Sequence, residues 1–288
     1  MRQQGNALLS MIGIASGAIL NVALDPLLIF GFGMGIRGAG LATAISQGVS
    51  FIIMLSLCGK KGGIRIRFKN FRPSWAAYRE INAGGLPSFA RQGLMSAAAI
   101  CLNQLAAQYG DASVAAFSVV NRIAMLASAA LIGYGQGFQT VCGFNYGAGR
   151  FDRVRAAFRH GLIVSTVYCL LLAFLGFVFA PDILRAFRSD DAEVVRMGAE
   201  ILRYQCLSFP LGGMIVMSNM YLQNIRKTVS AVILASARQG LFLIPALFIG
   251  EALLEFLGLE IAQAIADVCT FILAIPMTIP VLRRMGRK

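Results

Sequence analysis

The chain alternates between long apolar stretches and short polar or basic connections. Eight apolar stretches can be drawn, at about 7–31, 38–58, 86–109, 113–141, 158–180, 199–222, 229–250 and 258–282. Most hold the roughly 20 residues that a helix needs to cross the hydrocarbon core of a bilayer. A continuous apolar stretch in lipid satisfies its backbone polar groups as a helix, whereas a transmembrane strand would be shorter and alternating. The pattern therefore predicts an all-α, polytopic membrane protein with eight transmembrane helices.

Composition supports this class. Of the 288 residues, 57% are hydrophobic and only 14% are charged, whereas soluble domains carry about 25% charged residues. The net charge of +13 does not indicate nucleic acid binding, because the basic residues form short clusters between apolar stretches instead of one face or stripe. The sequence has no catalytic triad, phosphate-binding loop or metal-ligand cluster, so we expect neither an enzyme nor a bound cofactor.

The distribution of basic residues predicts the orientation. If the N-terminus is cytoplasmic and the eight stretches cross in turn, 18 of the 26 Lys and Arg residues lie in cytoplasmic segments and four lie in outer segments. This is a strong positive-inside bias. Both termini are therefore expected in the cytoplasm, with the chain in the cytoplasmic membrane of a bacterium as a multi-pass protein, where the bilayer is its main partner. We expect a monomer.

An internal repeat relates the two ends of the chain. LDPLLIFG at 24–31 matches LIPALFIG at 243–250 in four of eight positions, and GAGLATAISQGVSFII at 38–53 matches GLEIAQAIADVCTFIL at 258–273 in six of sixteen. Both copies run from inside to outside and back, so the repeat is parallel with a unit of six helices. The repeat predicts three segments: 1–58 as the last two helices of an N-terminal lobe, 59–85 as a cytoplasmic linker, and 86–288 as a complete six-helix lobe. We therefore expect that four helices are missing before the first residue.

Asp25 is the sharpest candidate for chemistry. A carboxylate at membrane depth costs about 2.5–3.5 kcal/mol on insertion scales, and such residues usually face a cavity and act in transport. Asn21 lies one helical turn earlier on the same face, Pro26 should kink the helix, and Thr43 in the returning helix could face the pair. These oxygen-bearing groups are suited to a proton or a small cation such as Na⁺. The alternative is a structural hydrogen bond between helices, worth about 1 kcal/mol.

Other polar residues in the apolar stretches favour structural roles. We expect Asp267 to pair with one of the four arginines inside the stretches, which are Arg91, Arg122, Arg203 and Arg238. Four amide residues are candidates for lining a polar cavity, namely Gln92, Asn121, Gln139 and Asn145. Each of them is more often a contact between helices than a ligand contact.

The chain resembles the multidrug and toxic compound extrusion (MATE) transporters of bacteria. The resemblance runs from RQQGNALLSMIGIASGAILNVALDPLLIFGFGMGIRGAGLATAISQ through GLPSFARQG and GFQTVCGFNYGAGRFDRVR to the last apolar stretch. It implies twelve helices in two lobes, of which the first four are absent here. It also implies export of amphipathic, often cationic small molecules in exchange for H⁺ or Na⁺, with Asn21, Asp25 and Thr43 at positions of the family's N-lobe cation site.

Two departures and two alternatives accompany this resemblance. The family's aspartate on its first helix has no counterpart, and the acidic residues that some Na⁺-coupled members use in the second lobe are absent, which favours coupling through Asp25. A lipid-linked sugar flippase of the same superfamily is the alternative transporter. The other alternative is an inactive truncated fragment, since half of a lobe cannot close a central cavity.

Overall fold

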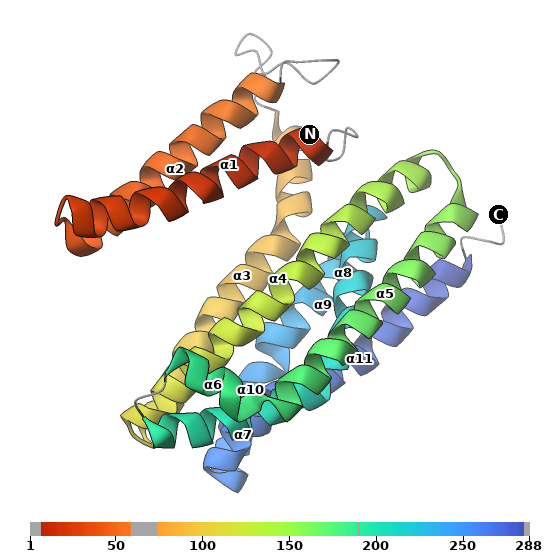
Figure 1. The fold of residues 1–288 in the computed structure, drawn as a ribbon. Coiled ribbons are helices and arrows are strands. Elements are labelled where there is room, and N and C mark those ends of the chain that lie inside the picture. Colours follow the sequence, from red (N-terminus) through yellow and green to blue (C-terminus); the bar gives the residue numbers. More distant parts are fainter. Residues whose placement is uncertain (1–6, 59–73, 189–190, 285–288) are drawn as a thin grey trace. The chain divides into compact units, whose positions relative to one another are not determined.

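The computed structural model describes residues 7–58, 74–188 and 191–284, and every regular element in this part of the chain is a helix (Figure 1). The chain is therefore the all-α membrane protein that the apolar pattern predicts. The elements in order are α1 (Ala7–Pro26), the π-helical turn η2 (Leu27–Gly31), α2 (Gly35–Cys58), α3 (Trp75–Ala107), α4 (Asp111–Gly147), α5 (Phe151–Val178), α6 (Ala180–Phe187), α7 (Ala192–Ser208), the 3₁₀ turn η4 (Phe209–Leu211), α8 (Gly212–Asn224), α9 (Thr228–Ser236), the π-helical turn η5 (Ala237–Leu241), α10 (Leu243–Leu254) and α11 (Phe256–Arg284).

The helices fall into two compact units, Met1–Ser74 and Trp75–Lys288. In the first unit, α1 and η2 pack against α2 as a hairpin. The second unit holds α3 to α11. Within the predicted linker 59–85, helix α3 begins at Trp75 and continues into the next apolar stretch. Residues 59–73 of that linker lie outside the described part of the chain.

Six helical segments are long and apolar enough to cross a membrane: Leu9–Gly31, Gly35–Leu57, Asp111–Gly147, Phe151–Val178, Thr228–Leu254 and Phe256–Leu282. The predicted passes at 86–109 and 199–222 are also helical, in α3 and in α7–η4–α8, but neither is among these six. Pro210 breaks the second of them, because the 3₁₀ turn η4 separates α7 from α8 around it. Charged residues in the first half of α7, such as Arg196 and Glu200, lower its hydropathy further.

The two hairpins of the sequence repeat share a tight tip. In the first hairpin, a Cβ on Gly38 would lie 2.8 Å from the Leu28 backbone. In the second, formed by α10 and α11, a Cβ on the equivalent Gly258 would overlap the carbonyl group of Gly250. Because only glycine lacks that carbon, the returning helix can begin against the backbone of the outgoing helix at both tips. This shared constraint explains why the repeat preserves glycine at these positions.

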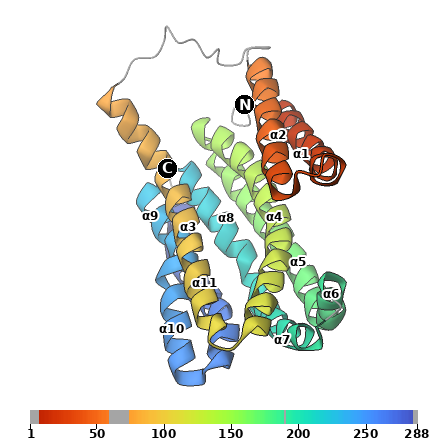
Figure 2. The same cartoon turned by 90° about the vertical axis from the view of Figure 1, so that its left-hand side faces the viewer.

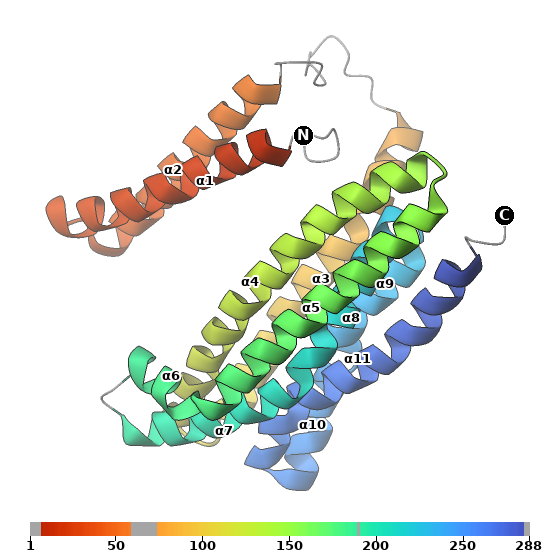
Figure 3. The same cartoon turned by 45° about the vertical axis from the view of Figure 1, so that its right-hand side comes forward.

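Two apolar clusters form the core of the second unit. In one of them, Phe138 of α4, Phe158 of α5 and Tyr221 of α8 are in ring contact, with centroids 6.2 Å apart for the first pair and 5.3 Å for the second. Figure 3 shows α4 and α5 as long neighbouring helices, with α6 and α7 at one end of them. Figure 2 shows α9 and α10 beside α3. The other cluster lies where α7, α10 and α11 meet α4, and it includes Phe117, Ile201 and Leu247.

Candidate functional site

The first candidate site lies at the end of α1, where Asn21 and Asp25 occupy one face of the helix. The amide Nδ2 of Asn21 donates to Oδ1 of Asp25 over 3.5 Å, and both residues are half-buried. That distance is at the long end of the hydrogen-bond range, so the contact orients the carboxylate only weakly. None of the ion pairs among the described residues includes Asp25. Among the described residues, the polar contact of this carboxylate is therefore the one with Asn21.

Pro26 follows Asp25, and a π-helical turn begins directly after it, whereas the sequence predicts a kink at this proline. Proline has no backbone N–H to donate to the carbonyl group four residues earlier, so the regular ladder cannot continue. The chain instead forms η2, in which the Phe32 N–H donates to the Leu27 carbonyl oxygen, five residues back, over 3.0 Å. Such turns often occur at functional sites in helices. The turn places the candidate carboxylate directly before a break in the helical ladder.

Thr43 is not joined to this pair by any hydrogen bond in the described part of the chain. Its hydroxyl group donates to the carbonyl oxygen of Ala39, one turn earlier in α2, over 3.0 Å, and the residue is exposed. The structure therefore brings together two of the three predicted site residues, Asn21 and Asp25. The role of Thr43 stays a prediction.

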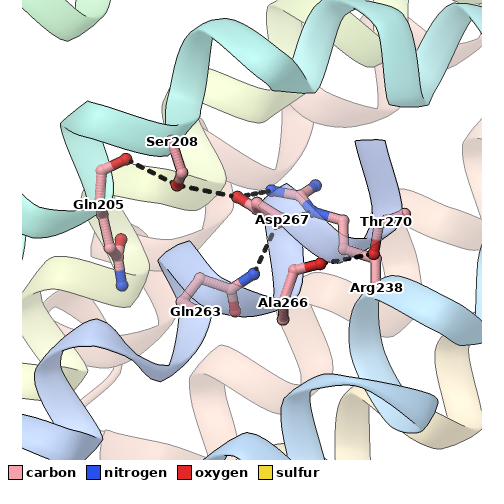
Figure 4. A network of polar contacts seen from close by, with 7 residues as sticks. All are labelled: Gln205, Ser208, Arg238, Gln263, Ala266, Asp267 and Thr270. Atoms are coloured by element: carbon pink, nitrogen blue, oxygen red, sulfur yellow. Dashed lines mark hydrogen bonds and ion pairs between the residues drawn. The ribbon is translucent and has the colours of Figure 1, made fainter. Parts of the chain in front are cut away.

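The second candidate site is a buried polar cluster around Asp267 in α11 (Figure 4). Arg238 of the π-helical turn η5 donates from Nε to Oδ1 of Asp267 over 2.7 Å and from Nη2 to Oδ2 over 3.4 Å. Asp267 is only 2% exposed. The expectation that Asp267 pairs with an arginine of the apolar stretches is confirmed, and the partner is Arg238.

Two further side chains complete the cluster, and sequence analysis missed both. Gln263, one turn before Asp267, donates from Nε2 to Oδ1 over 3.0 Å, and Ser208 at the end of α7 donates from Oγ to Oδ2 over 3.2 Å. The spacing of Gln263 and Asp267 repeats that of Asn21 and Asp25, which was a signal available in the sequence. The Ser208 contact depends on how α7 packs against α11, and no local pattern predicts it.

The four predicted cavity-lining amides have different surroundings. Gln92 and Asn121 are exposed, and Asn145 donates to the Val141 carbonyl oxygen of its own helix. Gln139 of α4 instead joins a chain of amides, in which its Nε2 donates to Oε1 of Gln223 in α8 over 3.2 Å. The side chain of Arg91, another residue singled out in the sequence, lies outside the described residues.

The Gln139 contact continues through α8 to α9. Nε2 of Gln223 donates to Oδ1 of Asn219 over 2.7 Å, and Nδ2 of Asn219 donates to the Ala231 carbonyl oxygen over 3.0 Å. Asn224 also donates to the carbonyl oxygen of Gln139 over 2.8 Å. Amide contacts of this kind hold transmembrane helices together at about 0.6 kcal/mol each. In this structure Gln139 therefore contributes to helix packing.

Comparisons with known proteins agree with these observations. The multidrug export protein MepA of Staphylococcus haemolyticus is 29% identical over 94% of this chain and 60% of its own length. That of Staphylococcus aureus strain N315 is also 29% identical, over 92% of this chain and 58% of its own length. The chain thus spans about 60% of the curated relatives that it matches.

Solved structures share the fold over nearly the whole chain. A MATE crystal structure in the straight conformation superposes with a TM-score of 0.88 at 25% identity, over 100% of this chain and 65% of that one. A transporter of the MOP superfamily from Pyrococcus furiosus superposes with a TM-score of 0.86 at 25% identity, over 96% and 63%. The MatE family model matches residues 87–249, which is more than half of the chain. The chain therefore belongs to the MatE family of membrane transporters.

Proposed function

We propose that this chain acts in a secondary active transporter that exports amphipathic, often cationic small molecules by antiport with H⁺ or Na⁺. Membership of the MatE family and the similarity to multidrug export proteins support the export of drug-like compounds. The observation that carries the coupling proposal is the Asn21–Asp25 pair, a carboxylate in a membrane helix with an amide neighbour and no ion pair among the described residues.

The proposed mechanism is alternating access between two lobes. The two units of the chain, Met1–Ser74 and Trp75–Lys288, correspond to part of an N-terminal lobe and to a C-terminal lobe in this proposal. A proton or Na⁺ at Asp25 neutralises the carboxylate and shifts the equilibrium between the inward-open and outward-open states. The π-helical turn after Pro26 supplies a segment of α1 whose backbone can change its hydrogen bonding as the ion binds.

The proposed orientation has both termini in the cytoplasm. Its support is the clustering of basic residues in the segments between α2 and α3, after α4 and at the C-terminal end. Single cysteines are placed at exposed positions at the start of α5 and directly after its end, Asp152→Cys and Phe179→Cys, in a background without the native cysteines. An impermeant thiol reagent should label Asp152→Cys from the cytoplasmic side and Phe179→Cys from the outer side. The reverse pattern, or labelling of both from the same side, would reject the orientation.

The coupling proposal is tested by Asp25→Asn. Vesicles carrying the 288-residue chain are loaded with a fluorescent lipophilic cation, and its export is measured with and without an inward H⁺ or Na⁺ gradient. We expect the variant to lose gradient-driven export while it still inserts in the membrane, because a neutral amide cannot take up a proton or balance the charge of a cation. The matched control is Asp182→Asn, at an exposed carboxylate of α6 that pairs with Arg185.

The outcomes separate the alternatives. Export by the unaltered chain would reject the hypothesis of an inactive fragment, and its absence would reject transport by this chain alone. Gradient-driven export that is unchanged in Asp25→Asn would remove Asp25 from the mechanism. Thr43→Val tests the third predicted residue: a fall in the apparent affinity for the coupling ion would include its hydroxyl group in the site.

A further inference from the structure

Asp267 is one of the few buried carboxylates in the described part of the chain, and all of its polar contacts are donors. Arg238, Gln263 and Ser208 approach it from η5, α11 and α7, at distances between 2.7 and 3.4 Å (Figure 4). A carboxylate removed from water needs both charge compensation and hydrogen bonds, since its effective burial cost is several kcal/mol. The guanidinium group supplies the charge, and the amide and hydroxyl groups supply the remaining bonds.

Among the side chains that the structure describes, one cation is paired with Asp267. The described ion pair of Asp267 is with Arg238 alone, whose side chain is 23% exposed against 3% for the carboxylate. From α7 the neighbouring polar group is the hydroxyl of Ser208, and from α11 it is the amide of Gln263. The charge balance of the cluster therefore rests on one arginine.

The oxygen atoms next to the guanidinium are of the kind that binds small cations. The Asp267 carboxylate oxygens and the Ser208 hydroxyl oxygen, which lie 3.2 Å apart at their contact, are hard oxygen ligands for hard cations. Gln263 stands four residues before Asp267, as Asn21 stands four residues before Asp25. The two carboxylates differ in their neighbours, because the guanidinium group of Arg238 lies next to Asp267 and no described arginine is paired with Asp25.

We propose that Arg238 is a tethered counter-ion that takes the place of an exchangeable cation at Asp267. The C-terminal unit thus carries a carboxylate that is permanently neutralised and does not load H⁺ or Na⁺. Removing the guanidinium while keeping the carboxylate opens a second site for a proton or a small cation. The consequence that only one carboxylate exchanges ions during transport rests on the proposed function, whereas the tethered counter-ion itself does not.

The test is carried out in an Asp25→Asn background, so that the first candidate site cannot contribute to the result. The purified full chain is prepared with no further change, with Arg238→Met, and with Arg238→Met/Asp267→Asn. The melting temperature is measured in buffers with Na⁺ or with N-methylglucamine at equal ionic strength, from mildly acidic to alkaline pH. Because the readout is thermal stability, it does not depend on whether the chain transports.

For the parent chain and for the double variant, we expect the melting temperature to be the same in Na⁺ buffer as in N-methylglucamine buffer. Neither protein has an unpaired carboxylate at this position. The Arg238→Met variant should melt several degrees lower in alkaline N-methylglucamine buffer, and Na⁺ or acidic buffer should restore most of that loss. If Arg238→Met folds only in Na⁺ or acidic buffer while Arg238→Met/Asp267→Asn is stable in every buffer, that outcome supports the proposal more strongly.

The proposal is overturned if Arg238→Met responds to Na⁺ and pH no more than the double variant does. It is also overturned if the double variant is as unstable as the single one, because the pair would then be needed for its packing and not for charge compensation. Loss of transport in any of these variants would bear on the proposed function and not on the tethered counter-ion.

Discussion

The two hairpins of the repeat share structural features but differ in the surroundings of their carboxylates. The first consists of α1, η2 and α2, and the second consists of η5, α10 and α11. Both include a π-helical turn and a proline, and both turn on a glycine that lies against the opposite backbone. Each has an amide residue four positions before an aspartate. Asp25 is half-buried with one weak contact, whereas Asp267 is buried, is bonded by Gln263 and Ser208, and forms an ion pair with Arg238. The two related hairpins thus hold a half-buried carboxylate with no ion pair among the described residues and a buried carboxylate that is paired with an arginine.

The position of the acid explains how this difference arises. Asp25 lies in the outgoing helix next to its proline, while Asp267 lies in the returning helix, where the first copy has Gln47. The second copy has Ile244 at the place of Asp25. Asp267 is therefore not the equivalent of Asp25 with an arginine partner added. It stands on another helix of the hairpin, where it faces η5 and the end of α7.

The largest effect on stability is expected from Arg238→Met alone. It should cost about 3–5 kcal/mol of unfolding free energy at neutral pH, because one partner of a buried ion pair is left uncompensated. Asp25→Asn should change the unfolding free energy by less than about 1 kcal/mol, since the Asn21 contact is long. Thermal denaturation of both variants in the same detergent measures the contrast, and equal losses would remove the distinction between the two carboxylates.

Much of this fold could be predicted from the sequence, because long apolar stretches, Pro26 and the repeated glycines are local signals. The π-helical turn next to Asp25 was not predicted, because Pro26 indicates a disturbance of the helix but not the hydrogen-bond pattern that follows it. The short helix α6 and the start of α3 at Trp75 were not predicted, because no continuous apolar stretch marks them. Residues 75–82 at the start of α3 are exposed.

The candidate sites were less predictable. Sequence analysis could expect an arginine partner for Asp267 but not select Arg238 among four, because the choice depends on the packing of η5 against α11. It also placed Thr43 with Asn21 and Asp25, whereas in the structure the Thr43 hydroxyl bonds to its own helix. A hydroxyl group in a helix has a carbonyl oxygen one turn away as a competing acceptor, and that local bond forms here.

The next effect in size tests the shared hairpin tip. Gly258→Ala should cost about 1–3 kcal/mol, because its methyl group would overlap the Gly250 backbone, which cannot move without separating α10 from α11. Gly38→Ala, with its contact at 2.8 Å, should cost less within the same range. Gly40→Ala is the matched control, because nothing lies within 4 Å of its Cβ position. A loss in the control as large as in Gly258→Ala would refute the steric explanation.

The smallest effect concerns a pair of hydroxyl residues that the repeat aligns. Ser50 of α2 donates to the Gly13 carbonyl oxygen of α1 over 2.7 Å, whereas the equivalent Thr270 bonds within α11 to Ala266. Ser50→Ala should therefore weaken the first hairpin by about 0.6–1.7 kcal/mol. Thr270→Val should change stability less. The comparison is made by thermal denaturation, and a larger loss in Thr270→Val would contradict the assignment of Ser50 as the contact between helices.

The central claim is that Asp25 exchanges ions and Asp267 does not. The most direct measurement is gradient-driven export of a fluorescent cation from vesicles that contain Asp25→Asn or Arg238→Met/Asp267→Asn. Each variant removes one carboxylate, and the second also removes its counter-ion, so that no charge is left unpaired. We predict that Asp25→Asn abolishes the response to an H⁺ or Na⁺ gradient and that the double variant keeps it. A double variant that loses the response while Asp25→Asn keeps it would contradict the account.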